Sequence, residues 1–318
     1  MSLPDHAIEI EGLRKTYAAT RSMPPKEALK GIDLKVKRGS IFGLLGPNGA
    51  GKSTTINILA GVTNKTVGAV KVWDRDIDRQ PRDARAAIGV VHQELAVDEF
   101  FTPRESMEQQ AGFYGVPRAE RRTDELLAAL GLSDKANAYV RALSGGMKRR
   151  LMVAKAMVHA PPVLILDEPT AGVDVELRRQ LWDYVSELNR QGVTIVLTTH
   201  YLEEAEALCD TIAIVNHGQV VTCQPTQALL KTLDGRTVVV TPKAALGVAP
   251  DLGRFHGKLL GDGRLAIDFK TTETDVETVL AAVRVSSVRS KEPVGSQATT
   301  WPWLTMAMVS QSCSASSR

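Results

Sequence analysis

One octapeptide constrains this chain more than any other feature: Gly46-Pro47-Asn48-Gly49-Ala50-Gly51-Lys52-Ser53, which fits the pattern G-x-x-x-x-G-K-[S/T]. It follows a short apolar run, Ile41 to Leu45, and precedes a helical pattern from Lys52 to about Leu59. Glycines let successive backbone N–H groups approach phosphate oxygens, and the helix adds its positive dipole end. A glycine-rich turn without a ligand is the alternative, which the flanking strand and helix disfavour. We therefore expect Gly46 to Thr54 to bind nucleotide phosphates.

Two side chains of this octapeptide and two carboxylates elsewhere predict a catalytic site. Lys52 would neutralise the β- and γ-phosphates, and the Ser53 hydroxyl would ligate Mg²⁺. The apolar run Val163 to Leu166 ends in Asp167 and Glu168. Asp167 suits the Mg²⁺ shell, and Glu168 can polarise an attacking water as a general base. Alone, such an acidic pair is also typical of a loop cap, but beside the octapeptide it indicates catalysis.

Alternation of apolar runs with helical patterns predicts the fold class. Ile41 to Leu45, Val163 to Leu166 and Val193 to Leu197 are typical of strands buried on both faces. Between the last two runs lies an amphipathic helix whose apolar face carries Leu177, Leu181, Val185 and Leu188. Together with the octapeptide, this pattern predicts an α/β fold, a P-loop NTPase core with a mostly parallel sheet.

Three further parts are predicted around this core. Ala7 to Leu13 and Ile32 to Val36 alternate apolar and polar residues, which is typical of an antiparallel β subdomain. Residues 94–160 have a helical pattern without a buried-strand run, so we expect a helical subdomain there. Residues 236–291 combine strand-like runs with one capped helical pattern, which predicts a small α+β appendage.

Bulk composition disfavours several classes of protein. Lys+Arg 39 against Asp+Glu 36 gives a net charge of +3, which provides no electrostatic case for nucleic acid. Three cysteines, an odd number, argue against a disulfide framework and for a reducing compartment. No apolar stretch reaches the roughly 18 residues needed to span a bilayer, and residues 1–6 lack the apolar core of a signal peptide. If this protein acts at a membrane, another chain must supply the crossing.

A second predicted anion site lies at Leu143-Ser144-Gly145-Gly146-Met147, which precedes another helical pattern. With this segment the motifs resemble those of the ABC-transporter ATPase family. The resemblance implies that two subunits pair head to tail. In that pair Ser144, Gly145 and Gly146 of one subunit close over the ATP bound in the cradle of the other. ATP and Mg²⁺ are therefore the implied ligands.

Four further residues match landmarks of this family, in family order. Tyr17 resembles the aromatic residue that stacks on adenine, with an ordinary strand-end tyrosine as the alternative. Gln93 resembles the glutamine that senses the γ-phosphate and Mg²⁺ and links to the helical subdomain. Asp174, in Ala171-Gly172-Val173-Asp174, matches the loop that contacts the other subunit, and it also suits a helix N-cap. His200 resembles the switch histidine that contacts the γ-phosphate.

The resemblance covers roughly residues 7–230 and is greatest to the ABC-2 exporter branch, which includes drug-resistance and nodulation-factor exporters. The run Met147-Lys148-Arg149-Arg150-Leu151, which continues the Ser144-Gly145-Gly146 motif, is similar to the sequence that follows this motif in that branch. The run Thr199 to Ala205 is also similar to the corresponding run of that branch. Cations at a helix N-terminus are disfavoured by the dipole. We therefore interpret Lys148 to Arg150 as offsetting the charge of the bound nucleotide, with a solvated basic face as the alternative.

The resemblance also suggests domain boundaries. We expect an ABC-type ATP-binding domain over residues 1–235, the appendage over 236–291 and an irregular tail over 292–318. Relatives of this branch end in an amphipathic helix, whereas the tail here is rich in Ser and Thr without apolar periodicity. Two explanations stay open, a disordered extension and a shifted reading frame, and the second is favoured.

The function expected from these features is an ATP-hydrolysing subunit of an ABC-2 type export transporter. Its partners would be a second copy and a multi-span membrane permease, with no nucleic acid, at the cytoplasmic side of the inner (cell) membrane. The expected catalytic residues are Glu168, His200 and Gln93, and the expected Mg²⁺ ligands are Ser53, Gln93 and Asp167. The rival is a soluble ABC-type ATPase that acts on ribosomes or DNA. A P-loop kinase or GTPase is disfavoured because it has no need of Ser144 to Gly146.

Overall fold

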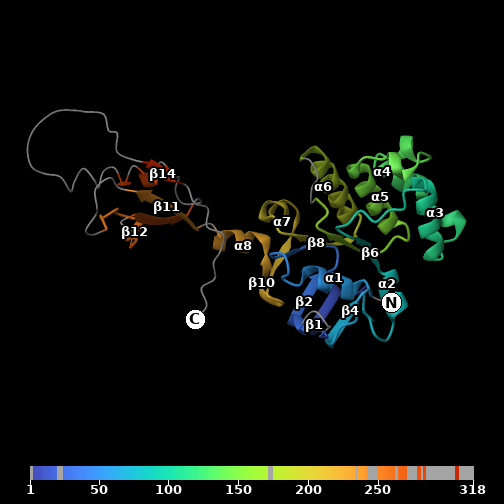
Figure 1. Ribbon diagram of the computed structural model, residues 1–318, viewed down its shortest axis with the longest axis horizontal. Coiled ribbons are helices and arrows are strands. Elements are labelled where there is room, and N and C mark those ends of the chain that lie inside the picture. The colour runs from blue at the N-terminus through green and yellow to red at the C-terminus, as the bar shows by residue number, and fades with distance from the viewer. Residues whose placement is uncertain are drawn as a thin grey trace, which may run out of the picture. The chain divides into compact units, whose positions relative to one another are not determined.

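The computed structural model describes residues 3–19, 24–170, 175–233, 235–241, 249–261, 264–270, 278–280, 282–283 and 305–307. The chain divides into two compact units, Met1–Thr226 and Gln227–Arg318. Figure 1 shows both units and labels several of their helices and strands.

The first unit is built on a six-stranded sheet with the strand order β10-β9-β3-β8-β7-β6. Its strands are β3 Ile41–Leu45, β6 Ile88–Val91, β7 Val163–Asp167, β8 Thr194–Thr199, β9 Thr211–Asn216 and β10 Gln219–Pro225. Neighbouring strands from β9 to β6 are all parallel, and β10 is antiparallel to β9. Every residue of β3, β7 and β8 is buried, as expected of strands covered on both faces. The predicted, mostly parallel sheet is confirmed.

A four-stranded antiparallel sheet with the order β2-β1-β4-β5 packs with this core. Its strands are β1 His6–Tyr17, β2 Lys26–Lys37, β4 Val67–Val72 and β5 Arg75–Asp76. The alternating apolar residues point inward, with Ile8, Ile10, Leu34 and Val36 all buried. Together with Phe42 of β3 they join one hydrophobic core. The antiparallel subdomain is therefore confirmed as well.

Helices surround the parallel sheet and also form a group of their own (Figure 1). The helices that alternate in sequence with strands of the two sheets are α1 Lys52–Leu59, α2 Pro81–Ala86, α6 Val175–Arg190 and α7 Leu202–Leu208. Residues 94–160 are all described and contain helices without a strand, as the sequence predicts for this segment. These helices are α3 Pro103–Phe113, η1 Arg118–Glu120, α4 Thr123–Ala129, η2 Ser133–Lys135, η3 Val140–Ala142 and α5 Gly145–Met157.

The second unit is a small α+β structure, as the appendage was predicted to be. After α8 Thr226–Leu233 it contains β11 Gly235–Thr241, β12 His256–Leu259, β13 Leu265–Lys270 and β14 Thr305–Ala307. These strands form an antiparallel sheet in the order β12-β13-β11-β14, with a core that includes Val240, Ile267 and Val279. Strand β14 falls within residues 292–318, for which we expect irregular structure, and the rest of that segment lies outside the described residues. Across the part of the chain that the structure describes, no helix is both long and apolar enough to cross a membrane.

Candidate functional site

Four predicted motifs meet at one edge of the six-stranded sheet. Strands β3, β8, β7 and β6 are adjacent and parallel, so their carboxyl ends lie side by side. The glycine-rich octapeptide follows β3, His200 follows β8, Asp167 ends β7 and is followed by Glu168, and Gln93 lies two residues after β6. This edge is where open α/β sheets bind their ligands.

The octapeptide forms a cradle that leads directly into helix α1. Gly51 caps the helix with φ 112° and has no side chain to bond the N–H donors of the first turn. This φ strains any residue with a Cβ, which would also lie 2.7 Å from Leu29 Cδ2 and 3.1 Å from the Ala28 carbonyl oxygen, so glycine is favoured. The first turn of α1 carries no acidic residue, and its N–H donors suit an anion. The side chain of Lys52 is 4% exposed, and its Nζ donates a hydrogen bond to the Gly46 carbonyl oxygen at 2.7 Å.

Asp167 and Glu168 are held beside this cradle. The Glu168 Oε1 atom lies 3.4 Å from Lys52 Nζ, and both residues are buried. Glu168 has φ 46°, in the left-handed region that a residue with a side chain seldom adopts. The hydroxyl of Ser53 and the carboxylate of Asp167 are oxygen ligands of the kind that Mg²⁺ prefers, so the residues present fit MgATP.

Thr198 in strand β8 contacts both carboxylate residues, and we did not predict it. Its Oγ1 donates a hydrogen bond to Asp167 Oδ1 at 2.6 Å and accepts one from the Glu168 backbone N–H at 2.9 Å. Thr198 is completely buried. The available signal was weak: a pair of threonines that ends an apolar strand immediately before His200.

His200 closes the cluster from the neighbouring strand. Its Nδ1 lies 3.5 Å from Glu168 Oε2, a contact that is an ion pair only when the imidazole is protonated. The His200 side chain is 38% exposed, so it can meet a ligand. Helix α7 begins two residues later. That helix carries buried Glu204, whose Oε1 accepts hydrogen bonds from Thr170 Oγ1 at 2.7 Å and from Trp182 Nε1 at 3.1 Å.

Ser144 stands apart from this cluster. Its side chain caps helix α5 by accepting a hydrogen bond from the Met147 backbone N–H at 3.3 Å, and Ser144 and Gly145 are exposed. Among the described residues, no hydrogen bond joins Ser144 to Lys52, Asp167 or Glu168. The predicted second anion site is therefore a separate, exposed helix N-terminus that begins at Gly145.

The three basic residues after Met147 have partners that neither interpretation of the sequence included. Lys148 Nζ pairs with Glu99 Oε1 at 2.7 Å. Arg149 is buried and donates to the carbonyl oxygens of His92 and Gln93, at 2.8 Å each. Arg150 Nη1 donates to the carbonyl oxygen of Leu130, also at 2.8 Å. These side chains therefore connect the start of α5 to the segment after β6 and to the end of α4. They form neither a solvated face nor a free positive cluster.

Tyr17 and Asp174 are the two further predicted nucleotide contacts. Tyr17 ends strand β1 and is 40% exposed, with the Lys15 ammonium 4.8 Å from its ring centroid. An exposed ring of this kind is free to stack on a base, as the sequence predicts. Asp174 lies outside the described residues.

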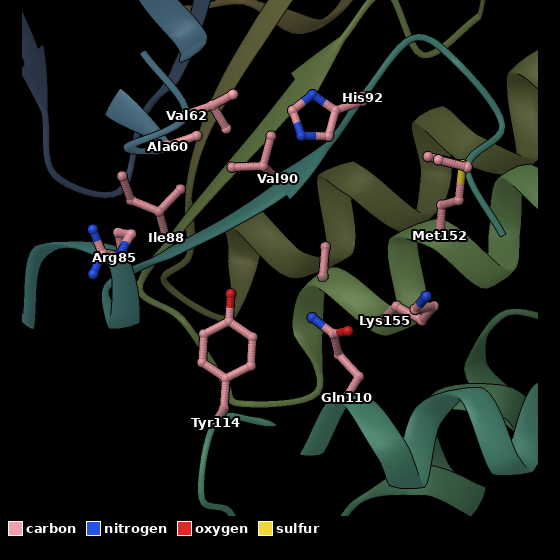
Figure 2. A pocket seen from close by; sticks show the side chains of 12 residues that line it. Ala60, Val62, Arg85, Ile88, Val90, His92, Gln110, Tyr114, Met152 and Lys155 are labelled. Carbon is pink, nitrogen blue, oxygen red and sulfur yellow. The ribbon is translucent and has the colours of Figure 1, made fainter. Parts of the chain in front are cut away.

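A pocket of about 290 Å³ lies between β6 and the helical subdomain (Figure 2). Figure 2 shows Ile88 and Val90 of β6 facing Tyr114 and Gln110, with Met152 and Lys155 of α5 along another side. Arg85 and Lys155 are the basic residues of its lining, which contains no carboxylate. Burial lowers the pKa of Lys155. The pocket reaches His92 and Ala96, on either side of Gln93, so it adjoins the predicted nucleotide sensor.

Comparison with known proteins agrees with this site. A family model described as "ABC transporter" matches residues 29–171. The chain is 41% identical to the daunorubicin/doxorubicin resistance ATP-binding protein DrrA of Streptomyces peucetius, over 74% of this chain and 70% of that protein. It is 37% identical to the linearmycin resistance ATP-binding protein LnrL of Bacillus subtilis (strain 168), over 73% of each chain. It is 39% identical to the Nod factor export ATP-binding protein I of Paraburkholderia xenovorans (strain LB400), over 74% of this chain and 77% of that one.

Solved structures show the same fold. One is the ATP-binding subunit of an ABC transporter, with 29% identity, a TM-score of 0.64, and 73% of this chain and 93% of that chain covered. Another is a dimeric post-hydrolysis state of the ATP-binding cassette MJ0796 bound to ADP and Pi, with 26% identity, a TM-score of 0.61, and 69% and 98% covered. The chain therefore belongs to the ABC transporter family, as an ATP-binding ATPase of the branch that contains the drug-resistance and Nod factor export proteins.

Proposed function

We propose that two copies of this chain pair head to tail around two ATP molecules and drive an ABC-2 type permease that exports its cargo from the cytoplasmic side of the membrane. The observation that carries this proposal is the separation of the two anion sites. Lys52 lies with Glu168 and His200, whereas Ser144 caps the exposed N-terminus of α5 and, among the described residues, makes no hydrogen bond to that cluster. A second copy, facing the other way, would bring the two sites together.

Within one cradle, the chain's own residues account for binding and hydrolysis. The N–H donors at the start of α1 and the Lys52 ammonium would hold the phosphates. Glu168, fixed by Lys52 and by Thr198, would accept the proton of the attacking water, while His200 would contact the γ-phosphate. Bound Mg²⁺, held by Ser53, Gln93 and Asp167, would neutralise charge on the β- and γ-phosphates.

The role of Glu168 is tested by Glu168→Gln. Loss of a general base should reduce ATP turnover by about 10²- to 10⁴-fold while ATP binding is kept. Glu203→Gln is the matched control, because Glu203 is an exposed glutamate of the neighbouring helix α7. Wild-type turnover in Glu168→Gln would refute the assignment of the base.

The head-to-tail pair is tested by mixing two inactive variants, Lys52→Ala and Ser144→Arg. Each mixed pair should contain one intact site, so ATPase activity should reappear on mixing and fall again on dilution. Lys52→Ala mixed with itself is the control. If the mixture stays inactive while dilute wild-type monomer hydrolyses ATP at the full rate, the shared site is refuted.

The pocket beside Gln93 is the proposed contact with the permease. Its cationic lining suits an acidic cytoplasmic segment of that partner. Large apolar side chains are exposed on or next to it: Val62 and Tyr114 line the pocket, and Leu95 and Phe113 adjoin lining residues in the chain. The double variant Arg85→Glu/Lys155→Glu should lose co-purification with the membrane permease and keep the ATPase activity of the isolated subunit. Recovery of ribosomes or DNA in place of a permease would favour the rival function.

A further inference from the structure

We propose that Arg149 is a positioning residue that joins the two ATP sites, by fixing the Gln93 segment of one site to the Ser144 helix that serves the other. This inference rests on the proposed head-to-tail pair. It assigns a positioning role to a side chain that the sequence predicted to offset the charge of the bound nucleotide.

The hydrogen bonds of Arg149 are of a kind that other side chains cannot reproduce. Its Nη1 donates to the His92 carbonyl oxygen and its Nη2 to the Gln93 carbonyl oxygen, both at 2.8 Å. Successive carbonyls of an extended chain point in opposite directions, so a group that binds both holds the chain in a bend at Gln93. The planar guanidinium offers parallel donors for this purpose, whereas a lysine ammonium is a single point charge.

Burial makes this contact more than a surface interaction. Arg149 is 6% exposed, and burial lowers the pKa of its guanidinium. Across the described residues its Nε has no hydrogen-bond partner, so the guanidinium relies on the two carbonyl oxygens. A buried cation that rests on two carbonyl oxygens would be left with none if the Gln93 segment moved away. Movement of that segment should therefore carry α5 with it.

Other contacts fasten the same two segments together. Lys148, adjacent to Arg149, pairs with Glu99 at 2.7 Å. Just before Ser144, the backbone N–H of Val140 donates to the Phe101 carbonyl and that of Arg141 to the Glu99 carbonyl. The chain from Gln93 to Phe101 is thus attached to residues 140–149 at both of its ends. Since Ser144 caps α5 and Arg149 lies five residues further on, Gln93 and Ser144 belong to one connected body.

This connection predicts cooperativity between the two sites. When ATP and Mg²⁺ engage Gln93 in one cradle, the Ser144 helix of the same chain moves with it, and that helix closes the cradle of the other copy. Binding at the first site would thereby prepare the second. Loss of the Arg149 link should leave each cradle able to bind ATP but make the two sites respond independently.

The test compares Arg149→Met, Arg149→Lys and the matched control Arg150→Met in the full-length chain. Arg150 is the neighbouring arginine, and among the described residues its carbonyl partner is Leu130 at the C-terminus of α4, which is not part of the Gln93 segment. Arg149→Met should lower kcat about tenfold or more and reduce the Hill coefficient for ATP from near 2 towards 1, with binding of a fluorescent ATP analogue to the monomer unchanged. Arg149→Lys, which keeps the charge, should lie between Arg149→Met and wild type.

A double-mutant cycle with Gln93→Ala separates this link from simple loss of stability. If Arg149 acts through Gln93, Gln93→Ala should reduce kcat in the wild type and reduce it little further in Arg149→Met. Additive losses, an unchanged Hill coefficient, or an equal effect of Arg150→Met would overturn the proposal. If Arg149→Met does not fold, the same double-mutant cycle is carried out with Arg149→Lys and Gln93→Ala, and its result decides the proposal. A wild-type protein without cooperativity, together with inactive Lys52→Ala and Ser144→Arg mixtures, would refute the proposed pair itself, and the cycle would still report on the Arg149–Gln93 contact.

Discussion

Thr198→Val tests whether the two carboxylates of the site depend on a residue from the neighbouring strand. The substitution keeps the shape of the side chain and removes its hydroxyl. Thr198 Oγ1 donates to Asp167 Oδ1 and accepts from the Glu168 N–H, so both contacts are lost together. Because Thr198 is fully buried, the groups left behind cannot turn to bulk solvent.

The expected magnitude is the sum of the losses of these two bonds. The bond to Asp167 ends on a carboxylate, and such a bond contributes about 1.5–3 kcal/mol, whereas a neutral bond contributes about 0.5–1.5 kcal/mol. The Glu168 N–H keeps a second acceptor, the Thr198 carbonyl oxygen at 3.2 Å. Loss of its bond to the Thr198 hydroxyl should therefore cost free energy at the low end of the range for a neutral bond. Together the free energy of unfolding should fall by about 2–4 kcal/mol. If half of this positioning energy, about 1–2 kcal/mol, is needed in the transition state, kcat should fall by about 5- to 30-fold.

The assay is steady-state ATP hydrolysis together with urea unfolding. Thr199→Val is the matched control, because neighbouring residues of a strand face opposite sides and Thr199 contacts the backbone N–H of Tyr201. The control should lose about 0.5–1.5 kcal/mol of stability and keep most of its activity. Equal kcat values for Thr198→Val and the wild type would refute the reasoning, as would a larger loss of kcat in the control.

Two further predictions concern buried groups outside the cradle. Glu204→Ala leaves the donors of Thr170 and Trp182 unpaired and should lower both the free energy of unfolding and kcat. Glu204→Gln keeps an oxygen that accepts from both donors and should retain most of the stability and the activity. Urea unfolding and ATPase assays measure the two quantities, and equal losses in the two variants would contradict this prediction. Burial lowers the pKa of His159, which stacks on Tyr114, to about 4, so below the usual value near 6.5 the unfolded state takes up a proton that the folded state does not. The wild type should therefore lose stability between about pH 6.5 and 4, by at most about 1.4 kcal/mol per pH unit, and His159→Phe should show a shallower loss.

The position of the site was predictable because each of its segments comes directly after an apolar strand run. Parallel strands bring the segments at their carboxyl ends to one edge of the sheet, so Lys52, Glu168 and His200 had to lie near one another once the runs were recognised. Gln93 has the same origin, since it comes after β6. A pattern of strands and glycine turns is local in the sequence, and therefore readable from it.

The partners of the buried polar groups were not predictable in the same way. Lys148, Arg149 and Arg150 are consecutive cations in the sequence, which suggests one shared role, yet each meets a different group. Both arginines bind backbone carbonyls, which every residue has and no motif marks. Thr198 was missed for a related reason: threonine is an ordinary strand residue, and its hydroxyl gains meaning only from β7 beside it.

The backbone of Glu168 indicates that part of the site's geometry is held against a local preference. Its φ of 46° disfavours any residue with a Cβ by about 1–2 kcal/mol, and glycine is free of this penalty. Glu168→Ala and Glu168→Gly remove the same carboxylate and keep the same N–H contact with Thr198. The difference between their free energies of unfolding therefore reports the conformational preference of the backbone at this position. Glycine loses more entropy on folding, which offsets part of the gain, and Glu168→Gly should remain more stable than Glu168→Ala by about 1 kcal/mol. At most positions alanine is the more stable of the two. Urea unfolding of both variants measures the difference, and an alanine variant as stable as the glycine variant would show that this turn relaxes when the glutamate is removed.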